Sequence, residues 1–315
     1  LPIYPGQLHL YQGNVGVYRR LVEETRRAAR DAFGREPVLV LQLTHSGRYS
    51  KPSGAPGSLI AHHSAVLDPF HKLPAEYPLV TDNYLDRLQD TFVAAARLAA
   101  EAGFDGVDIK SCHRYLLSEL LASFTREGKY GGSFENRTRM LRETLARVIA
   151  EVPGVFATVR LNAYDGIAYP YGWGVSREDE NQPDLAEPIA LVKLVREIGI
   201  PLLNVTIGNP YFNPHLNRPF DFPIQGMPAP AEHPLAGVAR FVAIARAVQE
   251  ACPELPVIAS GYTWLRQFMP HVAAGLIGSG GAAMIGQGRG AFAYPDSVRG
   301  LLETGRMDPA KIGRA

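Results

Sequence analysis

Short apolar segments alternate with helical segments along almost the whole chain, and this alternation limits the possible folds most strongly. We predict six strands, which begin near residues 37, 104, 155, 201, 256 and 282, with helices between them. Strands joined by helices form a parallel sheet through right-handed crossovers. Closing such a sheet into a barrel takes eight strands. The pattern therefore predicts a (β/α)8 TIM barrel whose first two strands are missing from this chain.

Both ends of the sequence lack the features of complete termini. The chain starts at Leu1 without an initiator methionine, and it stops at Ala315 without a closing element. We therefore expect residues 1–315 to form a single barrel domain that is truncated at both ends. A barrel without two of its strands would expose two open sheet edges.

The balance of charges and the cysteine content exclude several classes of protein. The chain has 32 basic and 31 acidic residues, for a net charge of +1. This balance gives no support to binding of nucleic acid or a membrane surface, and no apolar run approaches the ~20 residues that span a bilayer. Cys112 and Cys252 are the only cysteines, so a disulfide scaffold or a cysteine-rich metal site does not fit. We expect a cytoplasmic protein without a metal site.

One stretch, residues 103–132, carries an unusual density of ionisable groups. An apolar strand over Phe104–Ile109 is followed at once by Lys110, then by His113 and Tyr115. In α/β barrels, polar groups at the C-terminal ends of strands face the active-site mouth. The stretch therefore predicts the catalytic loop.

Polar residues also follow the other predicted strands. Since the carboxyl ends of parallel strands meet at one mouth, we expect these side chains to converge there. They are Gln42 and His45, His113 and Tyr115, Arg160, Asn204, Ser260 and Gly261, and Gly288 and Arg289.

Gln42 and Arg160 interrupt otherwise apolar strands. The strand over Pro37–Leu43 is predicted to be buried, with Gln42 as its polar exception. An unpaired buried guanidinium is costly, so Arg160 needs an anionic or electron-rich partner. The N1/O2 edge of a flavin would serve, and the Gln42 amide could bind the pyrimidine edge. A hydrogen-bonded Gln and a paired Arg inside the barrel are the structural alternative.

The last two strand–helix units predict a phosphate site. Ser260 and Gly261 follow one strand, and Gly288 and Arg289 follow the next. Free backbone amides at helix N-termini favour anions, and barrels commonly bind phosphate there. The alternative is that the glycines only form turns.

The catalytic loop offers acid and base candidates of different kinds. Tyr115 is a competent proton donor to a developing carbanion, and His113 could hydrogen-bond a carbonyl oxygen. The alternatives are a core tyrosine and a loop histidine. Lys110 either assists them or is a solvated charge, and Cys112 is more consistent with packing than with a nucleophile.

Three motifs together resemble the old yellow enzyme family, the NADH:flavin oxidoreductases, including their 2,4-dienoyl-CoA reductase-like branch. These are the run from Gln42 to Arg48 (QLTHSGR), Gly103–Asp108 followed by His113-x-Tyr115, and Tyr130–Arg137 (YGGSFENR). Val159-Arg-Leu161 and Gly286-x-Gly-Arg289 follow in the expected order. The resemblance covers nearly the whole chain.

The resemblance implies an FMN-containing barrel that passes hydride from NAD(P)H to an activated C=C bond of an α,β-unsaturated carbonyl compound. By position, Gln42 and Arg160 would bind the isoalloxazine. His113 would bind the substrate carbonyl, Tyr115 would supply the proton, and Lys110 stands where many members have His. The phosphate would lie at Ser260, Gly261, Gly288 and Arg289.

The sequence also departs from the family. The strands expected upstream are missing, and the cysteine cluster of the dienoyl-CoA reductase-like branch is not present, so we expect no iron–sulfur cluster within this chain. Small-molecule substrates are expected, with homo-oligomerisation left open. Two other hypotheses remain: a flavin-free barrel lyase or isomerase acting on a phosphorylated substrate, and an inactive barrel fragment of a larger flavoprotein.

Overall fold

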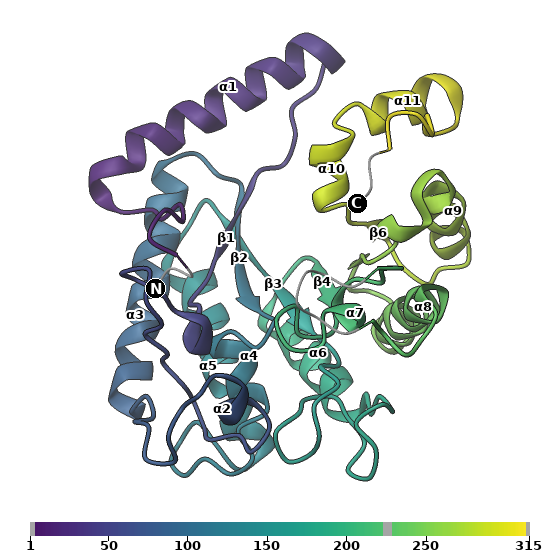
Figure 1. Ribbon diagram of the computed structural model, residues 1–315. Coiled ribbons are helices and arrows are strands. Elements are labelled where there is room, and N and C mark those ends of the chain that lie inside the picture. The colour runs from purple at the N-terminus through teal and green to yellow at the C-terminus, as the bar shows by residue number, and fades with distance from the viewer. Residues whose placement is uncertain (1–3, 223–228, 313–315) are drawn as a thin grey trace.

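Six parallel strands lie side by side in chain order in the computed structural model, which describes residues 4–222 and 229–312. Helices separate successive strands, so the predicted strand–helix alternation and parallel sheet are confirmed (Figure 1). The strands are β1 (Val40–Leu43), β2 (Gly106–Ser111), β3 (Phe156–Asn162), β4 (Leu203–Thr206), β5 (Val257–Ala259) and β6 (Met284–Ile285).

The helices cover the outer side of the curved sheet. α3 contacts β1 and β2, α5 contacts β2 and β3, and α8 contacts β5. The α-helices are α1 (Val15–Phe33), α2 (Leu67–Phe70), α3 (Asp82–Glu101), α4 (Leu116–Leu121), α5 (Phe134–Glu151), α6 (Ala186–Ile198), α7 (Pro214–Asn217), α8 (Pro234–Ala251), α9 (Met269–Gly278), α10 (Arg289–Ala293) and α11 (Ser297–Thr304). Short 3-10 helices are η1 (Gln12–Asn14), η2 (Gly47–Tyr49) and η3 (Thr263–Phe268).

The two faces of the sheet differ in chemistry because successive side chains of a strand point to opposite sides. Val107, Ile109 and Val159 point outward and are fully buried in the main hydrophobic core beneath the helices. Lys110 and Arg160 occupy the alternate positions and lie opposite each other in neighbouring strands. The inner face of the sheet is therefore polar.

The first strand differs from the prediction. It begins at Val40 instead of Pro37 and is not buried as a whole, since Val40 is 38% exposed and only Leu43 is buried. In the described part of the chain β1 is an edge strand that pairs only with β2. Its apolar composition suits a strand with neighbours on both sides, which explains the wrong prediction of burial.

The sheet is not closed among the described residues. β1 and β6 form its two edges and do not pair with each other. The order and direction of the strands are nevertheless those of a parallel barrel. None of the helices in the described ranges is both long and apolar enough to cross a membrane.

Candidate functional site

The strand register places a row of polar side chains on the inner face of the sheet. Gln42 lies opposite Asp108, and Lys110 lies opposite Arg160, which in turn lies opposite Asn204. The Gln42 amide donates a 2.7 Å hydrogen bond to the Asp108 carboxylate. The predicted strand boundary is corrected here, because β2 continues through Lys110 and Ser111 instead of ending at Ile109. Lys110 is thus a residue of the sheet, and the turn begins after Ser111.

Several polar atoms in this row are buried but unpaired. Arg160 Nε, Asn204 Oδ1 and Asp108 Oδ1 have no hydrogen-bond partner among the described residues. A buried polar group without a partner costs about 1–3 kcal/mol. Arg160 also forms no ion pair within the described ranges, which rules out a paired structural arginine there. The arrangement favours a polar or anionic ligand against the inner face.

Lys110 is almost buried, at 8% exposure, and its ammonium lies 3.5 Å from the centroid of the Tyr115 ring. Burial, together with the positive charge of Arg160, lowers the pKa of Lys110 to about 8. Such a cation over an aromatic ring is attracted by the π electrons and would stabilise negative charge on the phenol oxygen. Lys110 is therefore part of the site and not a solvated surface charge.

A strained turn carries His113 and Tyr115. His113 and Arg114 both have left-handed backbone conformations, with φ of 63° and 57°, and Tyr115 is the N-cap of α4. Non-glycine residues in this region cost about 1–3 kcal/mol and often mark functional sites. His113 Nε2 is buried without a partner, and burial, with the nearby charges of Lys110 and Arg160, keeps the His113 pKa well below its ordinary value. The imidazole is neutral and has a free nitrogen.

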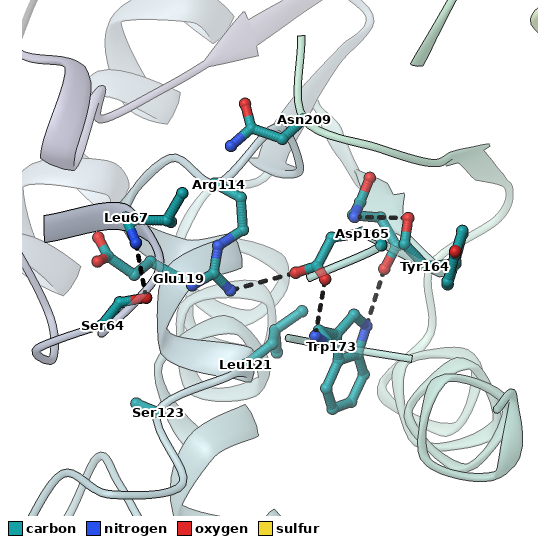
Figure 2. A network of polar contacts seen from close by, with 12 residues as sticks. Ser64, Leu67, Arg114, Glu119, Leu121, Ser123, Tyr164, Asp165, Trp173 and Asn209 are labelled. Atoms are coloured by element: carbon teal, nitrogen blue, oxygen red, sulfur yellow. Dashed lines mark hydrogen bonds and ion pairs between the residues drawn. The ribbon is translucent and has the colours of Figure 1, made fainter. Parts of the chain in front are cut away.

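A buried ion pair holds this turn in place (Figure 2). Arg114, which is fully buried, donates to the Asp165 carboxylate at 3.2 Å and contacts His62 Nε2 at 3.3 Å. Asp165 also accepts a 3.0 Å hydrogen bond from the backbone of Trp173. Burial raises the pKa of Asp165 to about 6, although Arg114 opposes the shift. The β3–α6 loop therefore fixes the residue between His113 and Tyr115.

A second buried arginine, Arg48, connects the β1–α3 segment to the helix after the turn. Its guanidinium donates to Glu119 at 2.6 Å and to Asp68 at 2.5 Å, and all of its side chain is buried. Glu119 belongs to α4, which Tyr115 caps. Arg48 belongs to a sequence motif, but its partners could not be predicted, because Asp68 and Glu119 lie 20 and 71 positions away.

The most important group that the sequence did not predict is Tyr211. Its hydroxyl lies 2.7 Å from the hydroxyl of Tyr115, and its ring stacks on Tyr49 with a centroid separation of 4.2 Å. Tyr211 belongs to the β4–α7 loop, residues 207–213, which contains none of the motifs described above. Tyr211 and Tyr115 are 96 positions apart in the sequence, and only the fold brings them together.

The four predicted phosphate residues lie after β5 and β6, but they are not equally informative. Gly261 has a φ of 102°, and a Cβ there would lie 2.6 Å from the Phe241 ring, so packing against α8 explains this glycine. The Ser260 hydroxyl is 3.5 Å from the Val205 carbonyl. Gly288 and Arg289 are exposed and begin α10. Burial, with the positive charges of Lys110, Arg160 and Arg289, lowers the pKa of His113.

A cavity of about 550 Å³ lies elsewhere, between β1, α3 and the segment 5–10. Gln42 lines it, whereas Lys110, His113, Tyr115 and Arg160 do not. It follows the unpaired edge of β1. In the described ranges, no group of three or more His, Cys, Asp or Glu side chains is arranged to hold a metal ion.

The NADH:flavin oxidoreductase / NADH oxidase family matches this chain over residues 4–172. The chain belongs to this family. The resemblance to the NADH:flavin oxidoreductases that was inferred from the sequence motifs is therefore confirmed.

Curated relatives match parts of the chain. An NADPH dehydrogenase of Clostridium acetobutylicum is 39% identical over 112 residues, 35% of this chain and 32% of the relative. The 12-oxophytodienoate reductase 1 of Oryza sativa subsp. japonica is 35% identical over 162 residues, 49% of this chain and 42% of the relative. The chain thus aligns with less than half the length of either family relative.

Two solved structures share the fold. A 2-naphthoyl-CoA reductase in complex with 2-naphthoyl-CoA superimposes with a TM-score of 0.71 and 21% identity, over 98% of this chain and 43% of that one. An old yellow enzyme homologue from Zymomonas mobilis gives a TM-score of 0.64 and 23% identity, over 95% and 74% of the two chains. The barrel class of the fold is therefore confirmed, although the described strands do not close.

The residues present fit the FMN that the family name implies. The unpaired Arg160 Nε and Asn204 Oδ1 supply a donor and an acceptor on the inner face, and the Gln42 amide lies in the adjoining row. Arg160 and Lys110 face only one carboxylate in that row, Asp108, so the inner face attracts a group with anionic or electron-rich oxygens.

Proposed function

We propose that this chain forms the FMN-binding barrel of an oxidoreductase that reduces the activated C=C bond of an α,β-unsaturated carbonyl compound with NAD(P)H. One observation carries the proposal: Arg160, whose Nε is buried without a partner, lies opposite Lys110 on the polar inner face, and the Lys110 ammonium lies 3.5 Å from the ring of the buried Tyr115. Family membership supports the redox chemistry. The domain would comprise residues 1–315.

Gln42 and Arg160 would hold the isoalloxazine, and Ser260, Gly261, Gly288 and Arg289 would hold the phosphate. FMN, when bound, would supply the hydride that it has accepted from NAD(P)H. Arg160 keeps a permanent positive charge, which stabilises negative charge on the pyrimidine edge. The exposed Arg289 meets a phosphate without the cost of burying its charge.

His113, Tyr115 and Lys110 would act on the substrate. The neutral imidazole of His113 can donate a hydrogen bond to a carbonyl oxygen and polarise the conjugated bond. Burial raises the pKa of Tyr115, so its hydroxyl stays protonated and serves as a donor. The Lys110 ammonium, 3.5 Å above the ring, lowers the cost of the phenolate that remains. The name of the rice relative, an oxophytodienoate reductase, supports a conjugated carbonyl substrate.

Substitution of Tyr115 by Phe tests the assignment. We expect Tyr115→Phe to slow oxidation of the reduced protein by 2-cyclohexenone about 100-fold or more, because the general acid is lost. Reduction by NADPH or NADH should stay within about twofold, since no proton from Tyr115 is needed there. Stopped-flow absorbance at the flavin band separates the two half-reactions. Equal losses in both would contradict the role given to Tyr115.

A further inference from the structure

The hydroxyl of Tyr115 contacts the hydroxyl of Tyr211, and side chains of the surrounding loops hold both tyrosines in place. The 2.7 Å contact between the hydroxyls of Tyr115 and Tyr211 joins the β2–α4 turn to the β4–α7 loop. The two rings are nearly parallel, at an angle of 12°. Tyr115 is 5% exposed, whereas Tyr211 is half-buried and therefore nearer to solvent.

The loop that carries Tyr211 is fixed by side chains of its own. The Tyr211 backbone amide donates to Asn209 Oδ1 at 3.0 Å. The Asn209 amide, fully buried, donates to the Tyr49 hydroxyl at 2.7 Å, and Tyr49 stacks on the Tyr211 ring. The ring and backbone of Tyr211 are thus held from two sides, while its hydroxyl is directed to Tyr115.

Asp165 binds a near neighbour of each of the two tyrosines. Arg114, directly before Tyr115, binds the Asp165 carboxylate (Figure 2). Asn213, two positions after Tyr211, donates to the Asp165 backbone carbonyl at 2.8 Å. Asp165 is fully buried and binds both the β2–α4 turn and the β4–α7 loop. The fold therefore determines the distance between the two hydroxyls.

We propose that Tyr211 is a further catalytic residue, which returns a proton to Tyr115 during reduction of the substrate. This inference rests on the proposed function. After hydride reaches the β-carbon, the α-carbon forms its C–H bond with the Tyr115 proton and the Tyr115 O–H bond breaks. The Tyr211 O–H bond then breaks as its proton moves to the Tyr115 oxygen. Tyr211 takes a proton from solvent water, which completes the balance.

The surrounding charges suit this transfer. The Lys110 ammonium over the Tyr115 ring stabilises the first phenolate, and the positive charge of Arg289 favours the second, on Tyr211. No carboxylate forms a hydrogen bond with either hydroxyl among the described residues. Burial and the bond to Tyr211 raise the pKa of Tyr115, whereas the bond to Tyr115 and the charge of Arg289 work against the rise in the pKa of Tyr211, so the proton moves toward Tyr115.

The test compares Tyr211→Phe, Tyr115→Phe and their double variant in the FMN-loaded protein, after photoreduction and mixing with 2-cyclohexenone. Tyr211→Phe should slow flavin oxidation about tenfold, through loss of the donated hydrogen bond. The double variant should be no slower than Tyr115→Phe, because two residues of one relay are not additive. Tyr77→Phe is the matched control: it removes one hydroxyl hydrogen bond of another half-buried tyrosine, the bond to the Ser58 carbonyl, and should stay within about twofold.

Tyrosine labelled with ¹³C at Cζ gives a second readout, which needs no bound flavin. Tyr115→Phe should shift the Tyr211 resonance, and Tyr211→Phe should shift that of Tyr115. Additive kinetic losses, or a Tyr211→Phe rate within twofold of the unmodified protein, would overturn the relay. Failure of the unmodified protein to be oxidised by the enone would overturn the proposed function instead, and unlinked ¹³C resonances would overturn the hydroxyl pairing itself.

Discussion

The loops after β1, β2, β3 and β4 and the ends of β5 and β6 lie at the same C-terminal edge of the sheet, yet they differ in structure. In the first region, the guanidinium groups of Arg48 and Arg114 are fully buried and bound to carboxylates. In the second, Gly288 and Arg289 are exposed. β2 and β3 pair over six residues, whereas β5 and β6 pair over two.

The difference follows from what each region is proposed to do. Proton transfer needs donor and acceptor at a fixed distance, which buried ion pairs and a strained turn can maintain. Binding of a phosphate needs mainly accessible positive charge and amides, which an open region provides. The catalytic loop is thus predicted to be rigid and expensive to alter, and the phosphate region tolerant.

The largest expected effect is on the buried ion pair of the rigid region. Asp165→Leu leaves Arg114 as an unpaired buried cation, so the free energy of unfolding should fall by about 3–5 kcal/mol. Replacing both partners, as in Arg114→Met with Asp165→Leu, should recover most of that loss. Urea denaturation measures both. If Asp165→Leu alone were as stable as the unmodified protein, the buried ion pair would not make this region more rigid than the phosphate region.

Within the phosphate region, we expect Gly261 to be the exception that does not tolerate substitution. Gly261→Ala puts a Cβ 2.6 Å from the Phe241 ring at a φ of 102°, so we expect a loss of about 2 kcal/mol in unfolding free energy. Gly275→Ala, in α9 with nothing within 4 Å, is the matched control and should stabilise by about 0.5–1 kcal/mol. Thermal denaturation ranks the two. If Gly261→Ala proved harmless, packing would not explain this glycine and a phosphate role would gain support.

Lys110, near the C-terminal end of β2 in the rigid region, gives a smaller effect that depends on pH. Its pKa of about 8 means that the ammonium is lost as the pH rises through 8, and the stabilisation of a Tyr115 phenolate is lost with it. Oxidation by enone should therefore fall several-fold between pH 7 and pH 9.5.

Two variants identify the group responsible. Lys110→Arg keeps its charge over this range and should give a flat profile, and Lys110→Met should be slow and flat. Stopped-flow rates across the pH range provide the comparison. A fall of the same size in Lys110→Met would assign the titration to another group.

Local sequence patterns predicted the order and direction of the six strands, because apolar strands and capped helices are defined by neighbouring residues. They also located Lys110, His113, Tyr115 and Arg160, since polar residues at strand ends have few structural explanations. The partners of these residues could not be predicted. Arg114 binds Asp165, which lies 51 positions away, and no local sequence pattern predicts the left-handed backbone conformation of Arg114.

The most specific motif, Tyr130–Arg137, turns out to hold the fold together. Arg137 donates to the Leu121 carbonyl and to Glu187, each at 2.6 Å, and so joins the end of α4 to α6. The Tyr130 hydroxyl donates to Asp86 at 2.5 Å. The motif therefore identified the family without lining the site, whereas Tyr211, which meets Tyr115, belongs to no motif.

The most direct test of the account is an FMN titration of the chain, with Arg160→Met as the comparison and circular dichroism to confirm that both are folded. We predict that the unmodified chain retains FMN after desalting, with a perturbed flavin spectrum, and that Arg160→Met binds at least about tenfold more weakly because a charge-assisted hydrogen bond is lost. A folded chain that retains no FMN, or an Arg160→Met variant that binds it equally well, would contradict the assignment of the inner face of the sheet as the flavin site.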